Sequence, residues 1–385
     1  MLDKGIFKEP KKELKCLYKP LEICANVLAN VCTTDMELIY LRIIYVKLMK
    51  KRQLTIKDIA KALNISASTV SRSLSDHPDI SQETKDIVVA YAKKNKYKPN
   101  VLASSLRTQN NKMIGVIIPE IVHYFFSTVL SGIEDEAEKE GYRVIISQSN
   151  EDYEKEVKGV QTFQEARVCG VLVSVSKKTH QYDHFQELID NEIPVVFFDR
   201  ICTGILTDRV VVDDYAGAYT AVEHLITTGC KRIAFFGSPS NLPISNNRRM
   251  GYEDALRKNG LEVDKSIMKI CDNYQEALTV TPELLSLPNP PDAFFAVNDE
   301  TAIAIMNIVK SKGLKIPDDV SVCGFTNSSL TEICDPPLTS VDQHCYELGA
   351  SAMKLLLNRI QSGTNDTQLN NKIIKTNLVV RKTTR

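Results

Sequence analysis

The stretch that decides the fold of the N-terminal part of this chain runs from Thr55 to Leu74 and reads TIKDIAKALNISASTVSRSL. Thr55, followed three residues later by Asp58, is typical of a capping box at the start of a helix. The residues that form the expected apolar stripe of this helix are Ile56, Ile59, Ala60 and Leu63. Their helical spacing predicts an amphipathic helix that ends near Asn64.

A second short helix is predicted immediately after a turn that Asn64 can make in the left-handed conformation. Ser66 is its expected N-cap, and Val70 is expected to pack against the small side chain of Ala60, where the helices cross. This spacing predicts a helix-turn-helix whose second helix can enter a major groove, although a generic two-helix hairpin has the same spacing. A third helix, capped by Ser81, is expected to carry on one side Thr84, Ile87, Val88 and Tyr91.

Charge is divided unequally along the chain. The 385 residues include 48 basic and 48 acidic side chains, which gives a net charge of zero. Residues 50–112 contain 13 basic and 5 acidic residues, a net of +8, whereas residues 113–385 contain 27 and 37, a net of −10. A basic unit ahead of a larger acidic one is typical of a DNA-binding head on a separate body.

Residues 1–48 lack the patterning of the rest of the chain. We interpret them as an upstream extension with Met49 as the native start, and a genuine accessory segment is the alternative. The most apolar early stretch, Leu38–Met49, contains Arg42 and Lys47 and is too short for a membrane span. The ten cysteines form no C-x-x-C pair, as expected of buried thiols in a reducing compartment. These features predict a cytoplasmic protein with no membrane partner.

Beyond residue 112, short apolar strands alternate with helix-length segments. The predicted strands are Met113–Ile118, Arg143–Ser147, Gly170–Val175, Pro194–Phe198, Lys231–Gly237, Ala293–Val297 and Val320–Phe325. Such alternation predicts parallel, doubly wound sheets. Because the rhythm occurs twice, we expect two α/β lobes with a ligand cleft at the carboxyl ends of their strands.

The sequence resembles the lac repressor/galactose repressor family of bacterial regulators. The resemblance covers residues 50–385, and its motifs include residues 55–74, Tyr97–Asn100, Leu102–Leu106, Arg248–Tyr252, Asn298-Asp299, Ile316–Phe325 and Pro337–Val341. It implies an α/β fold class, with an all-α helix-turn-helix head followed by a two-lobed, doubly wound effector domain like that of periplasmic binding proteins. The expected domains are an extension (1–48), the head (49–98), a hinge helix with linker (99–112), and the ligand-binding and dimerisation body (113–385).

The resemblance also implies roles for individual residues of the head and hinge. The expected DNA-binding residues are Thr55, Ser66, Ala67, Ser68, Thr69, Ser71, Arg72, Asn100, Ala103 and Leu106. Ala67 and Ser68 lie where the family contacts base edges, and their small side chains suit a methyl contact or a single hydrogen bond. Leu106 matches the family's minor-groove wedge, which kinks the operator centre. Helix capping alone is the alternative role for Thr69 and Ser71.

In the body, the resemblance implies an effector site of aromatic and charged side chains. The expected effector-binding residues are Phe125, Phe126, Asp213, Arg248, Tyr274, Asp299 and Thr326. Aromatic faces with Arg and Asp suit a sugar or a purine-like molecule, while simple core packing is the alternative for the two phenylalanines. Thr326 departs from the family, where many members carry an aspartate, so no known member's effector can be transferred directly.

These observations predict a homodimeric transcription regulator, a repressor that binds a palindromic operator in double-stranded DNA under the control of a small-molecule effector. We expect no enzymatic activity, cofactor or metal, because nucleotide-binding, serine-hydrolase and zinc-protease motifs are missing and the six histidines show no ligand pairing. The alternatives are a sugar-binding protein of the periplasmic type without a DNA-binding role, and an enzyme on an α/β body.

Overall fold

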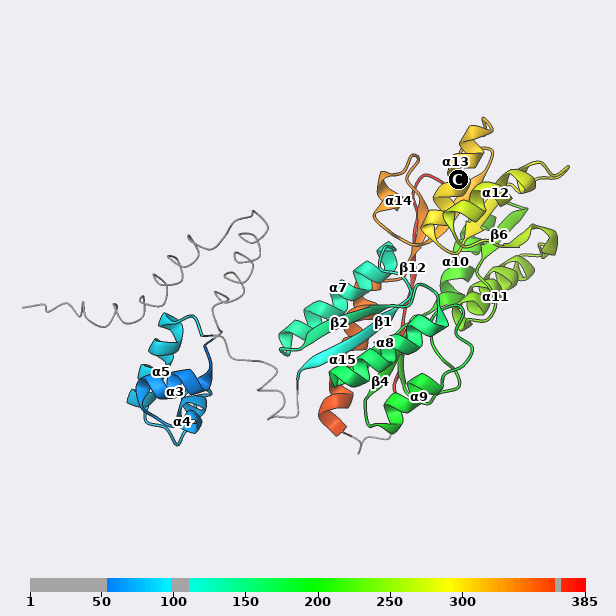
Figure 1. The fold of residues 1–385 in the computed structure, drawn as a ribbon. Coiled ribbons are helices and arrows are strands. Elements are labelled where there is room, and N and C mark those ends of the chain that lie inside the picture. The colour runs from blue at the N-terminus through cyan, green and yellow to red at the C-terminus, as the bar shows by residue number, and fades with distance from the viewer. Residues whose placement is uncertain (1–53, 98–110, 364–367) are drawn as a thin grey trace, which may run out of the picture. The chain divides into compact units, whose positions relative to one another are not determined.

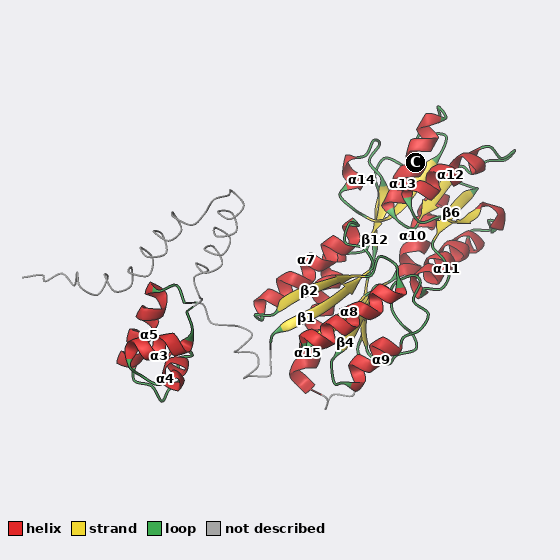
Figure 2. Ribbon diagram, viewed as in Figure 1, coloured by secondary structure: helices red, strands yellow, loops and turns green. Residues whose placement is uncertain are grey.

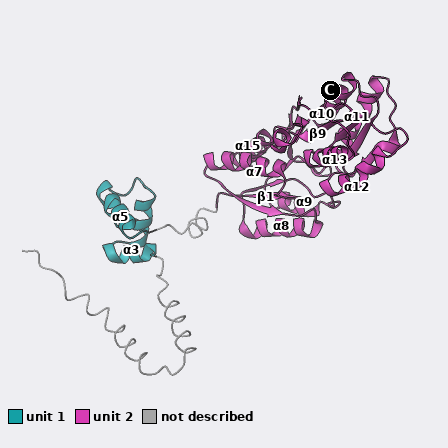
Figure 3. Ribbon diagram, turned by 90° about the horizontal axis from the view of Figure 1, so that it is seen from above, with its two compact units in different colours: residues 1–100 teal, residues 101–385 magenta. Residues whose placement is uncertain are grey.

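A computed structural model describes residues 54–97, 111–363 and 368–385 of the chain. It divides into two compact units, residues 1–100 and 101–385 (Figure 3). The expected N-terminal extension, together with the hinge residues Asn100, Ala103 and Leu106, lies outside the described residues.

The first unit contains three helices around a small apolar core. They are α3 (Ile56–Leu63), α4 (Ala67–Leu74) and α5 (Gln82–Lys94). Thr55 and Asp58 form the predicted capping box, Asn64 ends α3 in the left-handed conformation, and Ser66 and Ser81 cap the next two helices. The core residues are Ile59, Ala60, Val70, Val88 and Ala92. The predicted crossing of Ala60 and Val70 is therefore present.

The side of α5 that carries the four expected residues faces the core only in part. Ile87 is 52% exposed, whereas Val88 and Ala92, one helical turn apart, are buried. The inner stripe of α5 therefore consists of Val88 and Ala92, because side chains at i and i+4 lie on the same face of a helix.

Lobe 1 of the second unit is a six-stranded parallel sheet flanked by helices (Figure 2). In sheet order its strands are β11 (Asn371–Ile374), β5 (Asp208–Val212), β4 (Val195–Phe198), β3 (Gly170–Val173), β1 (Met113–Ile118) and β2 (Arg143–Gln148). Its helices are α7 (Tyr124–Lys139), α8 (Tyr153–Ala166), α9 (Asp183–Asp190) and α15 (Cys345–Ser362). Strands β1 and β3 pair in parallel over four residues each, from Ile114↔Gly170 to Ile117↔Val173.

Lobe 2 repeats the same architecture. In sheet order its strands are β12 (Asn377–Val379), β10 (Thr339–Asp342), β9 (Ser321–Thr326), β8 (Ala293–Ala296), β6 (Ile233–Gly237) and β7 (Met268–Ile270), of which only β12 is antiparallel. Its helices are α10 (Asp214–Thr227), α11 (Pro243–Lys258), the 3-10 turn η1 (Lys265–Ile267), α12 (Tyr274–Leu285), α13 (Asp299–Ser311) and α14 (Leu330–Ile333). In each lobe the order in which strands are added to the sheet reverses beside the first strand, between β1 and β3 and between β6 and β8. Sheets of this kind bind ligands at such a point.

The chain crosses between the lobes three times (Figure 1). It passes from β5 into α10, returns from β10 into α15, and passes again from β11 to β12. Lobe 1 is therefore completed by a helix and an edge strand that follow lobe 2 in the sequence.

Helices α7 and α15 pack closely because both carry glycine at the contact. A Cβ atom added to Gly132 would lie 2.2 Å from the carbonyl oxygen of Tyr346, and one added to Gly349 would lie 2.0 Å from that of Val129. Real Cβ atoms do not approach so closely, so only glycine permits this helix spacing. Among the described residues, no helix is long and apolar enough to cross a membrane.

Candidate functional site

The N-terminal end of α4 is exposed and available for contact with another molecule. Ser66, Ala67, Ser68 and Arg72 are exposed, while Thr69 and Ser71 are half-buried. Backbone N–H groups at a helix start and small side chains beside them can approach DNA phosphates and base edges closely.

The hydroxyl groups at this end form a local network. The Ser66 hydroxyl lies 2.7 Å from that of Ser68 and 2.8 Å from that of Thr69, and it accepts a 3.0 Å hydrogen bond from the Thr69 amide. Ser66 therefore has a capping role, and Ser68 has an exposed hydroxyl held at a fixed place. Thr55 donates to Asp58 in the α3 capping box at 2.6 Å, so its side chain is also held by a local contact.

Most of the net positive charge of residues 50–112 comes from the segments before and after the described residues 54–97. Residues 54–97 contain seven basic and five acidic residues, a net of +2. Residues 50–53 and 98–112 contribute three basic residues each, and these complete the net +8 of residues 50–112. Arg72 is the basic residue on α4, and its contact with Asp79 is long, 3.8 Å, and largely exposed.

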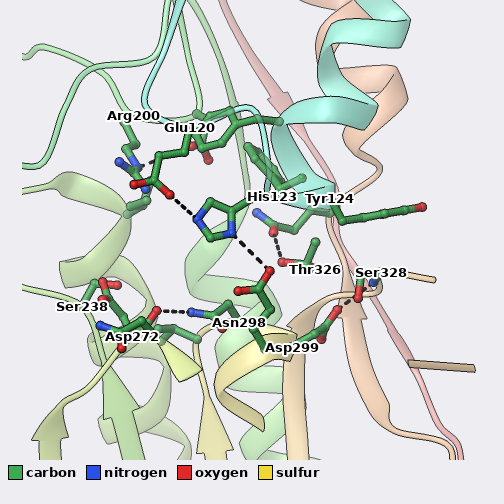
Figure 4. A pocket seen from close by; sticks show the side chains of 18 of the residues that line it. Glu120, His123, Tyr124, Arg200, Ser238, Asp272, Asn298, Asp299, Thr326 and Ser328 are labelled. Atoms are coloured by element: carbon green, nitrogen blue, oxygen red, sulfur yellow. Dashed lines mark hydrogen bonds and ion pairs between the residues drawn. The ribbon is translucent and has the colours of Figure 1, made fainter. Parts of the chain in front are cut away.

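The second candidate site is a cavity of about 280 Å³ between the two lobes, which we call the interlobe cavity (Figure 4). Its wall comes from segments that directly follow the strands of both sheets. They include Glu120 and His123 after β1, Glu151 after β2, Lys177 after β3, Asp199 and Arg200 after β4, Ser238 after β6, Asp272 and Asn273 after β7, Asn298–Glu300 after β8, Thr326 and Ser328 at the end of β9, and Gln343 after β10. The carboxyl ends of the strands therefore meet at this cavity, as the two-lobed fold predicts.

Phe125 and Phe126 lie in the first turn of α7, which begins at Tyr124, one turn earlier than the Thr128–Glu140 segment suggested. The two rings meet edge to face, with centroids 5.0 Å apart. Phe126 is buried beneath the Arg200 guanidinium, and Phe125 is half-buried and lines the cavity. Phe125 is thus the ring better placed to cover an apolar face of a ligand.

Arg248, on α11, lines the cavity and is 7% exposed. Its Nε and Nη2 atoms each lie 2.7 Å from Asp214 Oδ1, and its Nη1 donates to the Val297 carbonyl at 2.7 Å. The guanidinium also lies over the Phe325 ring, 4.0 Å from its centroid. Burial raises the pKa of Asp214, and the nearby Arg248 opposes that rise.

Two carboxyl groups in the wall, those of Asp199 and Asp299, are almost fully buried. Burial raises the pKa of each to about 6. Asp299 accepts hydrogen bonds from the Ser340 hydroxyl (2.5 Å) and the Ser328 amide (2.7 Å). Asp199 has a left-handed backbone, with φ +57°, which is uncommon for a residue other than glycine. Such a conformation at the end of β4 directs a carboxyl group to a place that an extended strand would not reach.

Charged side chains bridge the lobes across the cavity. His123 of lobe 1 contacts Glu120 at 2.7 Å and Glu300 of lobe 2 at 3.2 Å, and its pKa is raised chiefly by the hydrogen bond with Glu300. Lys177 of lobe 1 pairs with Asp272 of lobe 2 at 2.7 Å. The lobes are therefore held together at the cavity by contacts that depend on charge.

Thr326 and Gln343 form a polar part of the wall in lobe 2. The Thr326 hydroxyl donates to Gln343 Oε1 at 2.9 Å, and Thr326 has a φ of +128°, a strained value for a side chain branched at Cβ. The Nε2 atom of Gln343 is buried, and no described residue accepts a hydrogen bond from it. It is thus a donor that a bound molecule could satisfy.

Two of the residues expected in the effector site lie outside the wall of the interlobe cavity. The Asp213 carboxylate caps α10 by accepting from the Ala216 amide at 3.0 Å. Tyr274 begins α12, packs on a core cluster, and accepts a hydrogen bond from Asn307 at 3.1 Å. Neither residue lines the cavity, and their role in effector binding stays a prediction.

The other five expected residues, Phe125, Phe126, Arg248, Asp299 and Thr326, line the cavity together, and their role in binding stays a prediction. Several wall residues were not predicted from the sequence, namely the charged Glu120, His123, Glu151, Lys177, Asp199, Arg200, Asp272 and Glu300, and the polar Gln343. Most of them follow a strand within a few residues, and that position was the available signal. Within the described ranges, no group of three His, Cys, Asp or Glu residues is arranged to hold a metal ion.

Comparison with known proteins agrees with both parts of this geometry. Residues 55–100 match the model of bacterial regulatory proteins of the lacI family, and residues 222–384 match a periplasmic binding protein-like domain. The chain is 32% identical to the HTH-type transcriptional repressor CytR of Escherichia coli K12 over 332 residues, which cover 86% of this chain and 96% of CytR. The chain belongs to the lacI family. It is therefore a transcription regulator with a helix-turn-helix DNA-binding head and a two-lobed effector body.

Two further proteins place this lacI-family chain among regulators of similar architecture. It is 32% identical over 308 residues to the ribose operon repressor of Bacillus subtilis 168, covering 80% of this chain and 92% of that protein. It also resembles the structure of the transcriptional regulator CelR in complex with cellobiose, with a TM-score of 0.65 and 25% identity, covering 86% of this chain and 99% of CelR.

Proposed function

We propose that this lacI-family chain is a repressor that binds a palindromic operator as a homodimer, and that a small molecule of the sugar type, bound in the interlobe cavity, alters its affinity for DNA. It acts by binding alone, without catalysis, in the compartment that holds the operator. The observation that carries the DNA-binding part is the exposed start of α4, where Ala67 and Ser68 are free to meet base edges.

The cavity supports the effector part of the proposal. Its wall comes from both lobes, so a molecule bound there contacts both at once, and His123 and Lys177 already bridge them. A ligand that favours one lobe arrangement over another shifts the equilibrium between them. CelR has been solved with cellobiose, which supports a sugar-type ligand for this chain. The hinge residues Asn100, Ala103 and Leu106 are proposed to transmit the change, with Leu106 as the wedge at the operator centre.

Selection from a random-sequence DNA pool by the full chain tests the operator proposal. We expect enrichment of a palindrome, with binding that falls steeply as salt increases, because phosphate contacts release counterions. Ser68→Ala is expected to alter base preference at two symmetric positions. Ser75→Ala, an exposed serine at the other end of α4, serves as the control and should leave preference unchanged. Enrichment of a non-palindromic site, or of none, would contradict the proposal.

Leu106→Ala tests the wedge separately. The variant is expected to bind the selected operator at least about tenfold more weakly, because the kink and its contacts are lost. The body should keep its stability. Unchanged affinity in a mobility-shift assay would rule out the wedge role for Leu106.

A further inference from the structure

A buried carboxylate lies in lobe 1 behind the segment that contacts lobe 2. Glu156, in the first turn of α8, is 0% exposed, although a glutamate is rarely fully buried unless it has partners. It does not line the interlobe cavity. Its side-chain partners lie in residues 174–182, which join β3 to α9 and which we call the β3–α9 loop, and in the first turn of α9. Glu156 therefore connects α8 to the loop that follows β3.

Three donors converge on the carboxylate of Glu156. Its Oε2 accepts from the Ser176 amide at 2.8 Å, and its Oε1 accepts from the Thr179 hydroxyl at 2.7 Å and lies 3.1 Å from His184 Nε2. Hydrogen bonds to an ionised group are shorter and stronger than those between neutral groups. Because the site is buried, removal of the carboxylate would leave the donors without a partner, and that loss costs more than an ordinary hydrogen bond contributes.

The β3–α9 loop depends on Glu156 because the middle of the loop has nothing apolar to bury. Residues near both of its ends pack on the core of lobe 1, whereas residues 176–181 read SKKTHQ. Ser176 and Thr179 are the buried residues of this stretch, and both donate to Glu156. Polar contacts with α8, rather than apolar packing, therefore fix the backbone of the loop.

The same loop carries Lys177, which contacts lobe 2 in two ways. Its Nζ lies 2.7 Å from Asp272 Oδ2, and its backbone carbonyl accepts a hydrogen bond from the Asn241 side chain. Its amide donates to Glu151 Oε2 at 2.6 Å, within lobe 1. The carbonyl contact depends directly on where the loop backbone lies, and the ammonium contact depends on it through a flexible four-carbon stem. Lys177 thus joins the lobes, and Glu156 holds the backbone on either side of it.

From these contacts we propose that Glu156 is a positioning residue of the regulator. It fixes the β3–α9 loop so that Lys177 bridges to lobe 2, and it thereby biases the equilibrium between lobe arrangements. This role rests on the proposed function, in which that equilibrium controls the affinity for DNA. The alternative is a purely structural role, in which Glu156 stabilises α8 and α9 while the contact between the lobes does not depend on it. The two are separated by a measurement of the contact itself.

A zero-length cross-link measures this contact in the full chain. A water-soluble carbodiimide activates the Asp272 carboxylate, the Lys177 amine attacks it, and an amide bond forms while the carbodiimide leaves as a urea. The reaction requires the two side chains to touch, as they do across the lobes at 2.7 Å. Tryptic mass spectrometry gives the yield relative to the pair Lys310 and Asp335, which lie 3.1 Å apart within lobe 2 and do not depend on the lobe arrangement.

Glu156→Gln keeps the size of the side chain but turns an NH2 group toward one of the donors. The loop is then expected to leave α8, and the relative yield should fall about tenfold, the effect of one lost hydrogen bond to a buried charge. Glu154→Gln removes the same charge from an exposed position of α8 and should leave the yield unchanged. An unchanged yield in Glu156→Gln, or no product between Lys177 and Asp272 in the parent protein, overturns the positioning role.

Thr179→Val provides a milder variant in case Glu156→Gln does not fold. It removes one of the three donors to Glu156 and changes the side chain little in shape. The relative yield is expected to fall about threefold, because a single neutral donor is lost. Circular dichroism confirms that the variant is folded. A folded Thr179→Val protein with the yield of the parent overturns the positioning role.

Operator binding tests the consequence for regulation. Glu156→Gln and Lys177→Met remove the same contact from its two ends, so both should change the affinity for the selected operator in the same direction. The expected change is at least about fivefold, the lower end of the usual coupling between sites. Affinities equal to that of the parent, with the cross-link reduced, overturn the link to DNA binding. If the selection described above enriches no palindrome, the proposed function fails instead, and the cross-link, which needs neither DNA nor effector, still decides the role of Glu156.

Discussion

The Arg248–Asp214 pair allows a quantitative prediction for the body of this regulator. In Arg248→Met, an apolar side chain of similar length fills the space, so little packing is lost. Asp214 remains 1% exposed and loses two contacts of 2.7 Å. Breaking a buried pair from one side costs about 3–5 kcal/mol, and the Val297 carbonyl loses a donor worth about 1 kcal/mol. We therefore expect the free energy of unfolding to fall by about 4–6 kcal/mol near pH 7.5.

The double variant Arg248→Met/Asp214→Asn serves as the matched control. It removes the stranded charge, so most of the loss should be recovered, and the two substitutions should show a coupling energy of about 3 kcal/mol. Urea denaturation of the full chain, followed by circular dichroism, measures all three variants against the parent protein.

The pH dependence of Arg248→Met provides a further check. Burial raises the pKa of Asp214, and the variant lacks the arginine that opposes this rise. The native state then holds a proton that the unfolded state releases above pH 3.8, so stability decreases as pH rises through the folded-state pKa. The deficit should be smallest near pH 4 and grow toward neutral pH. A deficit below about 1 kcal/mol, which is ordinary for a surface substitution, would refute the reasoning, as would a double variant no more stable than the single one.

Three further substitutions test other parts of the molecule by urea or thermal denaturation. Asp199→Asn should stabilise the ligand-free chain by about 1–3 kcal/mol at pH 7.5, because burial raises the pKa of Asp199 to about 6. The gain in stability should shrink toward pH 4, and a variant no more stable than the parent protein at pH 7.5 would contradict the prediction. Thr55→Ala should cost the head about 1 kcal/mol by removing the α3 cap, whereas Thr55→Ser should not. Gly349→Ala should cost lobe 1 at least about 2 kcal/mol, because its Cβ would lie 2.0 Å from the Val129 carbonyl oxygen; Ser362→Ala, at an exposed position of the same helix, is its control, and equal effects of the two would contradict this contact.

Local sequence signals predicted the head well. Caps and turns involve residues a few positions apart, so Thr55, Asn64, Ser66 and Ser81 could be assigned from sequence alone. The side of α5 that faces inward was less certain, because Ile87 is apolar but packs against nothing in the core of the head. Binary patterning cannot distinguish it from Val88, one residue and about 100° further round the helix.

In the body, the seven predicted strands are present within about two residues at their ends, but five others were missed. The missed strands β7, β11 and β12 have three or four residues each, too few for an alternating pattern, and β11 and β12 are stabilised by pairing with distant β5 and β10. The family resemblance assigned Asp213 to the effector site, whereas in the structure it is the neighbouring Asp214 that pairs with Arg248. One residue at a helix start separates a cap from a buried ion pair.

The return of the chain to lobe 1 has a consequence for synthesis on the ribosome. The β5 strand ends at Val212, and α15, which packs on β3, β4, β5 and α7, begins only at Cys345. At about 5–20 residues per second, translation of the intervening residues takes roughly 7–26 s. During that interval the apolar face that α15 will cover is exposed, and β5 is an open edge. Nascent chains of this regulator therefore present a chaperone substrate until almost the whole body has emerged.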